Sequence, residues 1–283
     1  MLKKNLVRTV LLSYGLFFLF TVITAMRPAN SKEKPFFLAW QITDTLSQPL
    51  YLDSSNQVSF NETEAPKISM NRNASKFVKS FLVKEDEALQ KVKQRSGSYF
   101  KMIEGVFSTY GLPVELKYLA VVESYLKTSA VSKVGAKGMW QFMPTTAKQL
   151  GLKISGKYDE RTHAYKSTVA AAKYLRDLHK QFGDWLLVVA AYNSGPGPIY
   201  SAIKKSGSRN FWALQNYLPQ ESRGHVKRFI GTHYFFEGKG SLVTLTKAET
   251  TRYLKEVEVF ETSLQLKEAA KDSVDAVALM ETR

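Results

Sequence analysis

Glu123 is the residue whose type and surroundings most directly suggest catalysis. It follows the run from Val114 to Val122, which becomes steadily more apolar toward the glutamate. Removal from water raises the pKa of a carboxyl group, and an acid that stays protonated near neutrality can donate its proton to a glycosidic oxygen. The alternative is a glutamate that turns to solvent at a helix end, so Glu123 taken alone indicates catalysis only weakly.

Two segments further along the chain carry groups that suit sugar recognition. They are 138–144 (GMWQFMP) and 191–197 (AYNSGPG). The amide side chains of Gln141 and Asn193 each offer a donor and an acceptor to N-acetyl and hydroxyl groups. The rings of Trp140 and Tyr192 could stack on pyranose faces, although a core position fits Trp140 at least as well.

Together with Glu123, these segments resemble the catalytic signature of the lytic transglycosylases in the goose-type lysozyme-like superfamily, nearest to the subgroup of membrane-bound lytic murein transglycosylase D. The resemblance covers about Tyr99 to Gly238, and its parts occur in the family's order and spacing. It implies a compact, mostly α, lysozyme-like domain with a long groove for glycan strands. In a late groove segment, His225 stands where a tyrosine is usual and Lys227 where a proline is usual. These departures concern substrate fit and not the reaction.

Carried over residue by residue, the resemblance makes Glu123 the catalytic acid/base. The positions that it places in the groove as substrate-binding residues are Ser124, Ser132, Gly138, Met139, Gln141, Phe142, Met143, Tyr192 and Asn193. Gly135 and Gly138 are expected to let the backbone pass close to the sugar without interference from a side chain. The resemblance implies no metal and no organic cofactor.

The implied reaction needs a single carboxylate, whereas most glycosidases use two. In a lytic transglycosylase the nucleophile is the substrate's own hydroxyl on carbon six of N-acetylmuramic acid. Glu123 would protonate the bridging oxygen of the β-1,4 bond to N-acetylglucosamine and then accept the hydroxyl proton. The product is a 1,6-anhydromuramoyl end, and ring closure within one sugar gains from proximity.

Two other functions stay open at this point. A hydrolytic muramidase of the goose-type lysozyme kind would need a second carboxylate, for which Asp159, Glu160 and Asp184 are the candidates. Asp184 precedes Trp185 as a helix N-cap would, and the other two lie in a charged loop, so each also has a structural interpretation. A non-catalytic peptidoglycan-binding protein would keep the groove and lose the chemistry, which the glutamate at position 123 argues against.

The composition limits the remaining classes of function. The formal net charge of +15 favours polyanionic surroundings such as nucleic acid, acidic lipid or an anionic wall polymer. No nucleic-acid recognition motif accompanies the charge, so we expect no nucleic-acid partner. The absence of cysteine excludes thiolate metal sites and argues against a lipoprotein anchor. The four histidines lack the spacing of metal ligands.

The N-terminus predicts export. Basic residues precede an uncharged apolar run from Val10 to Ala25, which is the order found in export signals. The run is slightly shorter than the roughly 20 residues that span a bilayer, and Ile23 and Ala25 form a mediocre cleavage site. We expect residues 1–26 to be a signal peptide or a retained membrane anchor. The rest of the chain is expected in the periplasm, with peptidoglycan glycan strands as its partner.

The rest of the sequence indicates a mostly helical organisation. Residues 27–70 are expected to be an irregular linker, and the apolar periodicity of 71–98 predicts a helical arm. Helical patterns separated by glycine and proline continue through 99–238, the expected catalytic domain. Alternating strand patterns are almost absent. Residues 239–283 are expected to form a short C-terminal tail with a β-like patch at 242–245.

Overall fold

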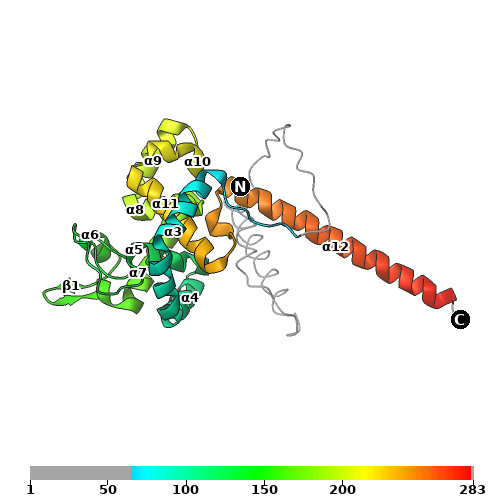
Figure 1. Cartoon of the computed structure of the whole chain (residues 1–283), viewed down its shortest axis with the longest axis horizontal. Coiled ribbons are helices and arrows are strands. Elements are labelled where there is room, and N and C mark those ends of the chain that lie inside the picture. Colours follow the sequence, from blue (N-terminus) through cyan, green and yellow to red (C-terminus); the bar gives the residue numbers. More distant parts are fainter. Residues whose placement is uncertain (1–64, 282–283) are drawn as a thin grey trace, which may run out of the picture. The chain divides into compact units, whose positions relative to one another are not determined.

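The computed structural model describes the backbone of residues 65–281 and the side chains of residues 65–270. The expected signal or anchor at 1–26 and most of the expected linker at 27–70 lie outside the described residues. Within the described part, helices form nearly all of the regular structure, as Figure 1 shows. The mostly α fold class predicted from the sequence is therefore confirmed.

The elements follow one another without a large sheet. The α-helices are α3 (Arg72–Arg95), α4 (Gly97–Thr109), α5 (Tyr118–Ser124), α6 (Pro144–Gln149), α7 (Ala164–Phe182), α8 (Trp185–Ser194), α9 (Pro196–Ser206), α10 (Phe211–Leu214), α11 (Gln220–Glu237) and α12 (Lys247–Glu281). The short 3₁₀ helices are η1 (Val114–Lys117), η2 (Glu160–Thr162), η3 (Gln215–Tyr217) and η4 (Leu242–Thr244). Strands β1 (Ile154–Ser155) and β2 (Tyr158–Asp159) pair antiparallel, with Ile154 opposite Asp159.

Helix α8 lies at the centre of the core. Its residues from Trp185 to Ala191 are all buried, because α7, α9 and α11 pack around it. A helix that is apolar on every side needs such neighbours to remove it from water. Its N-terminus is capped by Asp184, whose Oδ1 accepts hydrogen bonds from the backbone N–H groups of Leu186 and Leu187. The N-cap interpretation of Asp184 is thus confirmed.

Helix α3 coincides with most of the expected arm and packs along α11. Val78 and Leu89 of α3 are buried in the same hydrophobic core as α8. Gly231 of α11 permits the close approach, since a Cβ there would lie 2.7 Å from the ring of Phe81. The arm is therefore an integral part of the core that carries the candidate site.

The predicted β-like patch at 242–245 is wrong. The segment forms η4, in which Ser241 and Thr244 make a reciprocal capping box. Val243 and Leu245 are buried, so the apolar composition of the segment reflects packing in the core and not strand pairing. The tail then continues as the 35-residue helix α12. Among the described residues, no helix is long and apolar enough to cross a membrane.

Candidate active site

Glu123 lies in the last turn of α5, where an apolar helix reaches the surface. Leu119, Ala120 and Val121 of this helix are fully buried. The Glu123 side chain is 14% exposed, so it is largely removed from water and still accessible. The apolar run seen in the sequence thus holds the carboxylate at the border between core and solvent.

The backbone around Glu123 is strained. Tyr125 and Leu126, just after α5, have φ angles of 52° and 61°, and Gln141 has a φ of 49°. They are the non-glycine residues with positive φ in the described part of the chain. Such conformations cost on the order of 1–3 kcal/mol each and cluster at functional sites. Helix α3 holds the turn, because Arg95 donates to the Tyr125 carbonyl (2.8 Å) and the Tyr125 hydroxyl donates to Glu85 (2.7 Å).

His225 of α11 contacts the carboxylate directly. Its Nε2 lies 2.8 Å from Oε1 of Glu123, and its side chain is 2% exposed. Its Nδ1 is buried and has no hydrogen-bond partner among the described residues. The sequence identified this position only as a departure from the family pattern. That departure, a titratable ring in a groove segment, was the available signal for a functional residue.

Three of the predicted binding residues use hydrogen bonds to shape the loop 130–143. Gln141 donates from Nε2 to the carbonyls of Gly138 (2.7 Å) and Ala130 (3.3 Å). The Ser124 hydroxyl donates to the carbonyl of Met139 (2.8 Å), which ties the end of α5 to the loop. Ser132 Oγ accepts from the N–H of Ala136 (2.9 Å). These side chains build the wall of the site before any sugar is bound.

Gly138 is required by a close contact within the protein. A Cβ at this position would lie 1.9 Å from the backbone oxygen of Arg161, and its φ is +85°. The role of Gly138 beside a bound sugar stays a prediction. Gly135 also has a positive φ of +88°, but a Cβ there would meet open space.

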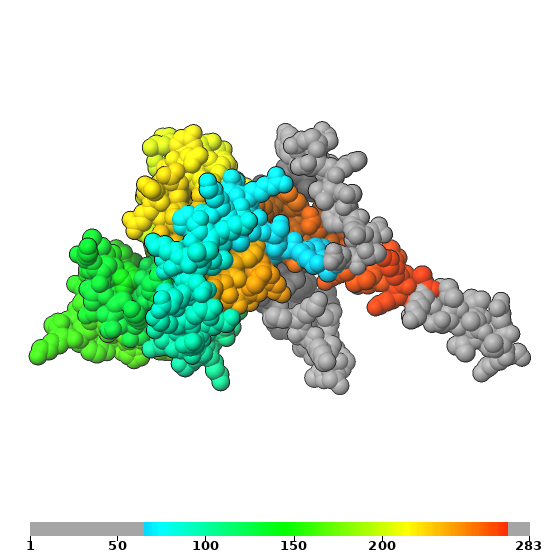
Figure 2. Space-filling view, in the orientation of Figure 1, coloured from blue at the N-terminus to red at the C-terminus, as the bar shows by residue number. Residues whose placement is uncertain are grey.

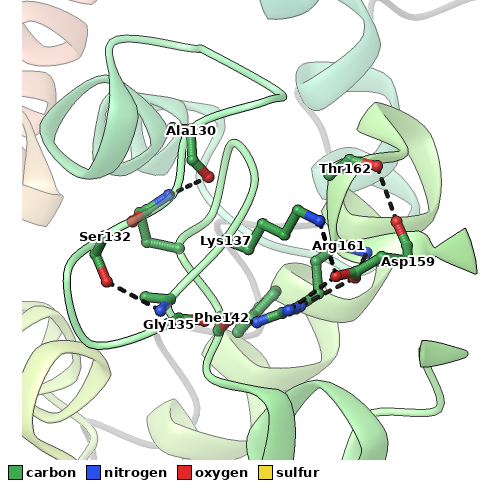
Figure 3. A network of polar contacts seen from close by, with 10 residues as sticks. Ala130, Ser132, Gly135, Lys137, Phe142, Asp159, Arg161 and Thr162 are labelled. Carbon is green, nitrogen blue, oxygen red and sulfur yellow. Dashed lines mark hydrogen bonds and ion pairs between the residues drawn. The ribbon is translucent and has the colours of Figure 1, made fainter. Parts of the chain in front are cut away.

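Arg161 also stabilises the loop 130–143 through hydrogen bonds, as Figure 3 shows. Its Nη1 donates to the carbonyls of Gly135 (2.8 Å) and Phe142 (2.9 Å). Its Nε and Nη2 donate to the two carboxylate oxygens of Asp159 (3.0 and 2.8 Å), while Lys137 lies 3.2 Å from the same carboxylate. These cations hold the pKa of Asp159 at about 2. Sequence reasoning gave Arg161 no such role, because its loop partners lie 19 and 26 residues away.

The remaining residues of 138–144 divide into core and surface. Met139 and Trp140 are fully buried, Phe142 is 3% exposed, and Trp140 donates from its indole N–H to Thr168 (2.9 Å). The side chains of Met139 and Phe142 therefore pack beneath the loop, and the assignment of these two positions to substrate binding stays a prediction. Met143 is 42% exposed and is available to a ligand.

Tyr192 and Asn193 lie at the end of α8 and face the same region. The Tyr192 hydroxyl donates to the carbonyl of Trp140 (2.8 Å), and its ring packs against Phe142 and Tyr174. Burial, followed by the charge of Glu123, raises the pKa of Tyr192. Asn193 Oδ1 accepts from a hydroxyl of α11. Tyr192 thus connects α8 to the loop 130–143, and Asn193 connects α8 to α11. Tyr192 lies near enough to Glu123 for the carboxylate charge to affect its pKa.

The three candidates for a second catalytic carboxylate are all engaged in structural contacts. Asp159 is bound to Arg161, as described. Glu160 is 5% exposed and accepts from Lys166 Nζ (2.5 Å) and from the backbone N–H of Lys153 (2.7 Å), and these contacts hold its pKa at about 2. Asp184 is 4% exposed, and burial raises its pKa to about 6 while it caps α8. None of the three is free to serve as a nucleophile.

The surface of the described part has an indentation on the side of α6 and α9. Figure 2 shows this indentation between the green segment, which includes α6 and β1, and the yellow segment, which includes α9 and α10. Along the chain, the loop 130–143 leads into α6, and α8, which ends with Tyr192, Asn193 and Ser194, leads into α9. In the described residues, no group of histidines and carboxylates is arranged to hold a metal ion.

Comparison with known proteins agrees with this geometry. Residues 107–215 match the family described as Transglycosylase SLT domain. The chain is 40% identical over 147 residues to membrane-bound lytic murein transglycosylase D of Escherichia coli (strain K12), a match that covers 50% of this chain and 32% of that protein. It is 34% identical over 117 residues to peptidoglycan transglycosylase gp16 of Escherichia phage T7, covering 41% of this chain and 9% of that protein. The chain thus matches less than a third of the length of either relative.

A solved structure is also similar. The 70 kDa soluble lytic transglycosylase of Escherichia coli aligns with a TM-score of 0.44 and 26% identity, covering 53% of this chain and 26% of that chain.

Proposed function

We propose that this chain, whose residues 107–215 match the family described as Transglycosylase SLT domain, is a lytic transglycosylase of peptidoglycan. It cleaves the β-1,4 bond between N-acetylmuramic acid and N-acetylglucosamine and leaves 1,6-anhydromuramoyl ends. The observation that carries the proposal is the accessible carboxylate of Glu123. Glu123 ends a buried helix at the border of the site, while the candidates for a hydrolase's second carboxylate are bound in structural contacts.

Glu123 performs both proton transfers in this proposal. Its Oε1 faces His225, which leaves Oε2 to exchange protons with the substrate. Oε2–H donates to the bridging oxygen as the bond from that oxygen to carbon one of N-acetylmuramic acid breaks. The hydroxyl on carbon six of the same sugar bonds to carbon one and gives its proton to the Glu123 carboxylate. The acid is thereby regenerated, and no water is consumed.

His225 is proposed to position Glu123 as a neutral imidazole that donates from Nε2 to Oε1. Its buried Nδ1, which lacks a partner among the described residues, is then an acceptor. In the other tautomer, or in the imidazolium, Nδ1 would carry a hydrogen and would be a buried donor without an acceptor. Buried donors without a partner are rarer in proteins than buried acceptors without one. A donor at Oε1 suits both states of Glu123, because this oxygen can accept as the carbonyl of the acid and as part of the carboxylate.

The enzyme is proposed to act in the periplasm in wall turnover or remodelling. The basic and then apolar start of the chain supports export, and the name of the relative from Escherichia coli describes it as membrane-bound. The net charge of +15 suits an anionic wall polymer.

The test is the release of soluble fragments from purified peptidoglycan by the wild type and by Glu123→Gln. The amide keeps the shape of the side chain but cannot supply the acidic proton or accept one, so we expect release to be abolished. A folded Glu123→Gln variant with undiminished release would remove Glu123 from this role.

A further inference from the structure

We propose that a pocket of about 840 Å³ between α3 and α11 binds the carboxylate-bearing peptide stem of the same peptidoglycan strand that lies at Glu123. The inference rests on the proposed function, since it names a second part of that substrate. The pocket is lined by Asn73, Phe77, Gln215, Asn216, Gln220, Glu221, Arg223, Gly224, Lys227 and Arg228. Helix α3, cyan in Figure 2, supplies one wall, and η3 and α11 supply the rest.

The pocket carries more positive than negative charge. Arg223, Lys227 and Arg228 line it together with one carboxylate, that of Glu221. None of the three cations forms an ion pair with a carboxylate in the described part of the chain. Burial and the neighbouring charge of Arg223 lower the pKa of Lys227. A bound anion would relieve this repulsion, which makes the site favourable for a carboxylate.

The other lining groups suit a peptide. Asn73, Asn216 and Gln220 each present an amide, which can pair with both the N–H and the C=O of a peptide backbone. Asn216 already accepts a long hydrogen bond from Arg223 (3.4 Å), so the guanidinium and the amide are held next to each other. Phe77 is 36% exposed and offers an apolar surface for a side chain or a methylene group.

The position of the pocket fits a branch from a strand bound at Glu123. Helix α11 turns its inner face, with Ser222 and His225, toward the site, and His225 touches Glu123. Gly224 and Arg228, which line the pocket, lie one residue before and three residues after His225 on the adjacent face of the same helix. A stem that leaves the sugar at the catalytic residue therefore needs to cross only the flank of one helix.

The proposal is tested with Arg223→Gln/Lys227→Gln on two substrates, namely intact peptidoglycan and glycan strands whose stems have been removed by an amidase. We expect kcat/KM of the variant on intact peptidoglycan to fall about tenfold or more, as for loss of charged hydrogen bonds, and to fall much less on stripped strands. The matched control is Lys101→Gln/Lys255→Gln, which removes two exposed cations outside the pocket and should leave both activities unchanged. Equal losses on both substrates, or an equal loss in the control, would overturn the proposal.

A binding measurement separates this proposal from the proposed function. The stem peptide released by the amidase is titrated into the full chain by calorimetry, without any turnover. Binding to the wild type that is lost in Arg223→Gln/Lys227→Gln and kept in the control supports the pocket. No binding to the wild type overturns it, whatever the activity. A wild type that binds the stem but cleaves neither substrate would contradict the proposed function alone.

Discussion

At the scale of the residue, the arrangement that matters most is the contact of Glu123 with His225. The two residues are 102 positions apart in sequence and meet at 2.8 Å. The sequence indicated Glu123, because an apolar run that ends in a carboxylate is a local sequence pattern. It could not indicate the partner, since the packing of α11 against α5 is what brings the ring to the carboxylate.

Replacing His225 tests whether it positions Glu123. A glutamine places its amide N–H close to the place of Nε2, so His225→Gln should keep most of kcat. His225→Leu removes the donor and should lower kcat about 10-fold to 100-fold with little change in KM, because the loss concerns proton transfer and not binding. The check is steady-state kinetics of both variants, with melting temperatures measured alongside. Equal kcat values for the two variants would assign His225 to packing alone.

Tyr192 is expected to matter for stability as well as for the site. Tyr192→Phe leaves the carbonyl of buried Trp140 without its hydrogen bond, which should lower the free energy of unfolding by about 1–3 kcal/mol. Tyr200→Phe is the matched control, because its hydroxyl is near solvent and makes only a long contact to Gln181 (3.3 Å). Urea denaturation compares the two. Similar stabilities for both variants would contradict the structural role of the Tyr192 hydroxyl.

At the scale of the element, the loop 130–143 depends on contacts that no local pattern encodes. The sequence predicted the helices well, because glycine and proline mark their ends and apolar periodicity marks their buried faces. It assigned Ser124, Ser132 and Gln141 to the substrate, whereas their hydrogen bonds are made to the loop itself. A polar side chain beside a groove can serve either purpose, and only the folded geometry distinguishes them.

Two glycines of this loop provide a matched pair. Gly138→Ala places a Cβ 1.9 Å from the Arg161 carbonyl, so the loop and η2 must separate. Gly135→Ala meets no atom within 4 Å and costs only the strain of a positive φ, about 1–2 kcal/mol. We therefore expect Gly138→Ala to lose clearly more stability than Gly135→Ala, measured by thermal unfolding. Equal melting temperatures would show that the approach to Arg161 does not constrain the loop.

At the scale of the whole molecule, acid should weaken the fold through Asp159. Its pKa is about 2 in the folded protein and 3.8 ordinarily, so the folded state binds fewer protons than the unfolded state between these values. The stabilisation, about 2 kcal/mol, is complete above pH 4 and is lost as the pH falls toward 2. Asp159→Asn should reduce the dependence of the free energy of unfolding on pH in this range. Some dependence should remain, because the pKa of Glu160 is also about 2. An unchanged curve in Asp159→Asn would contradict the role of the Arg161 ion pair.

The central claim is that Glu123 alone, without a second carboxylate, converts a glycosidic bond into an anhydro end. Mass spectrometry of the muropeptides released from purified peptidoglycan tests it most directly, because an anhydro product is lighter than its hydrolysed counterpart by one water. We expect anhydromuramoyl products from the wild type and none from Glu123→Gln. Reducing-end muropeptides as the main product would contradict it and would identify the protein as a hydrolytic muramidase.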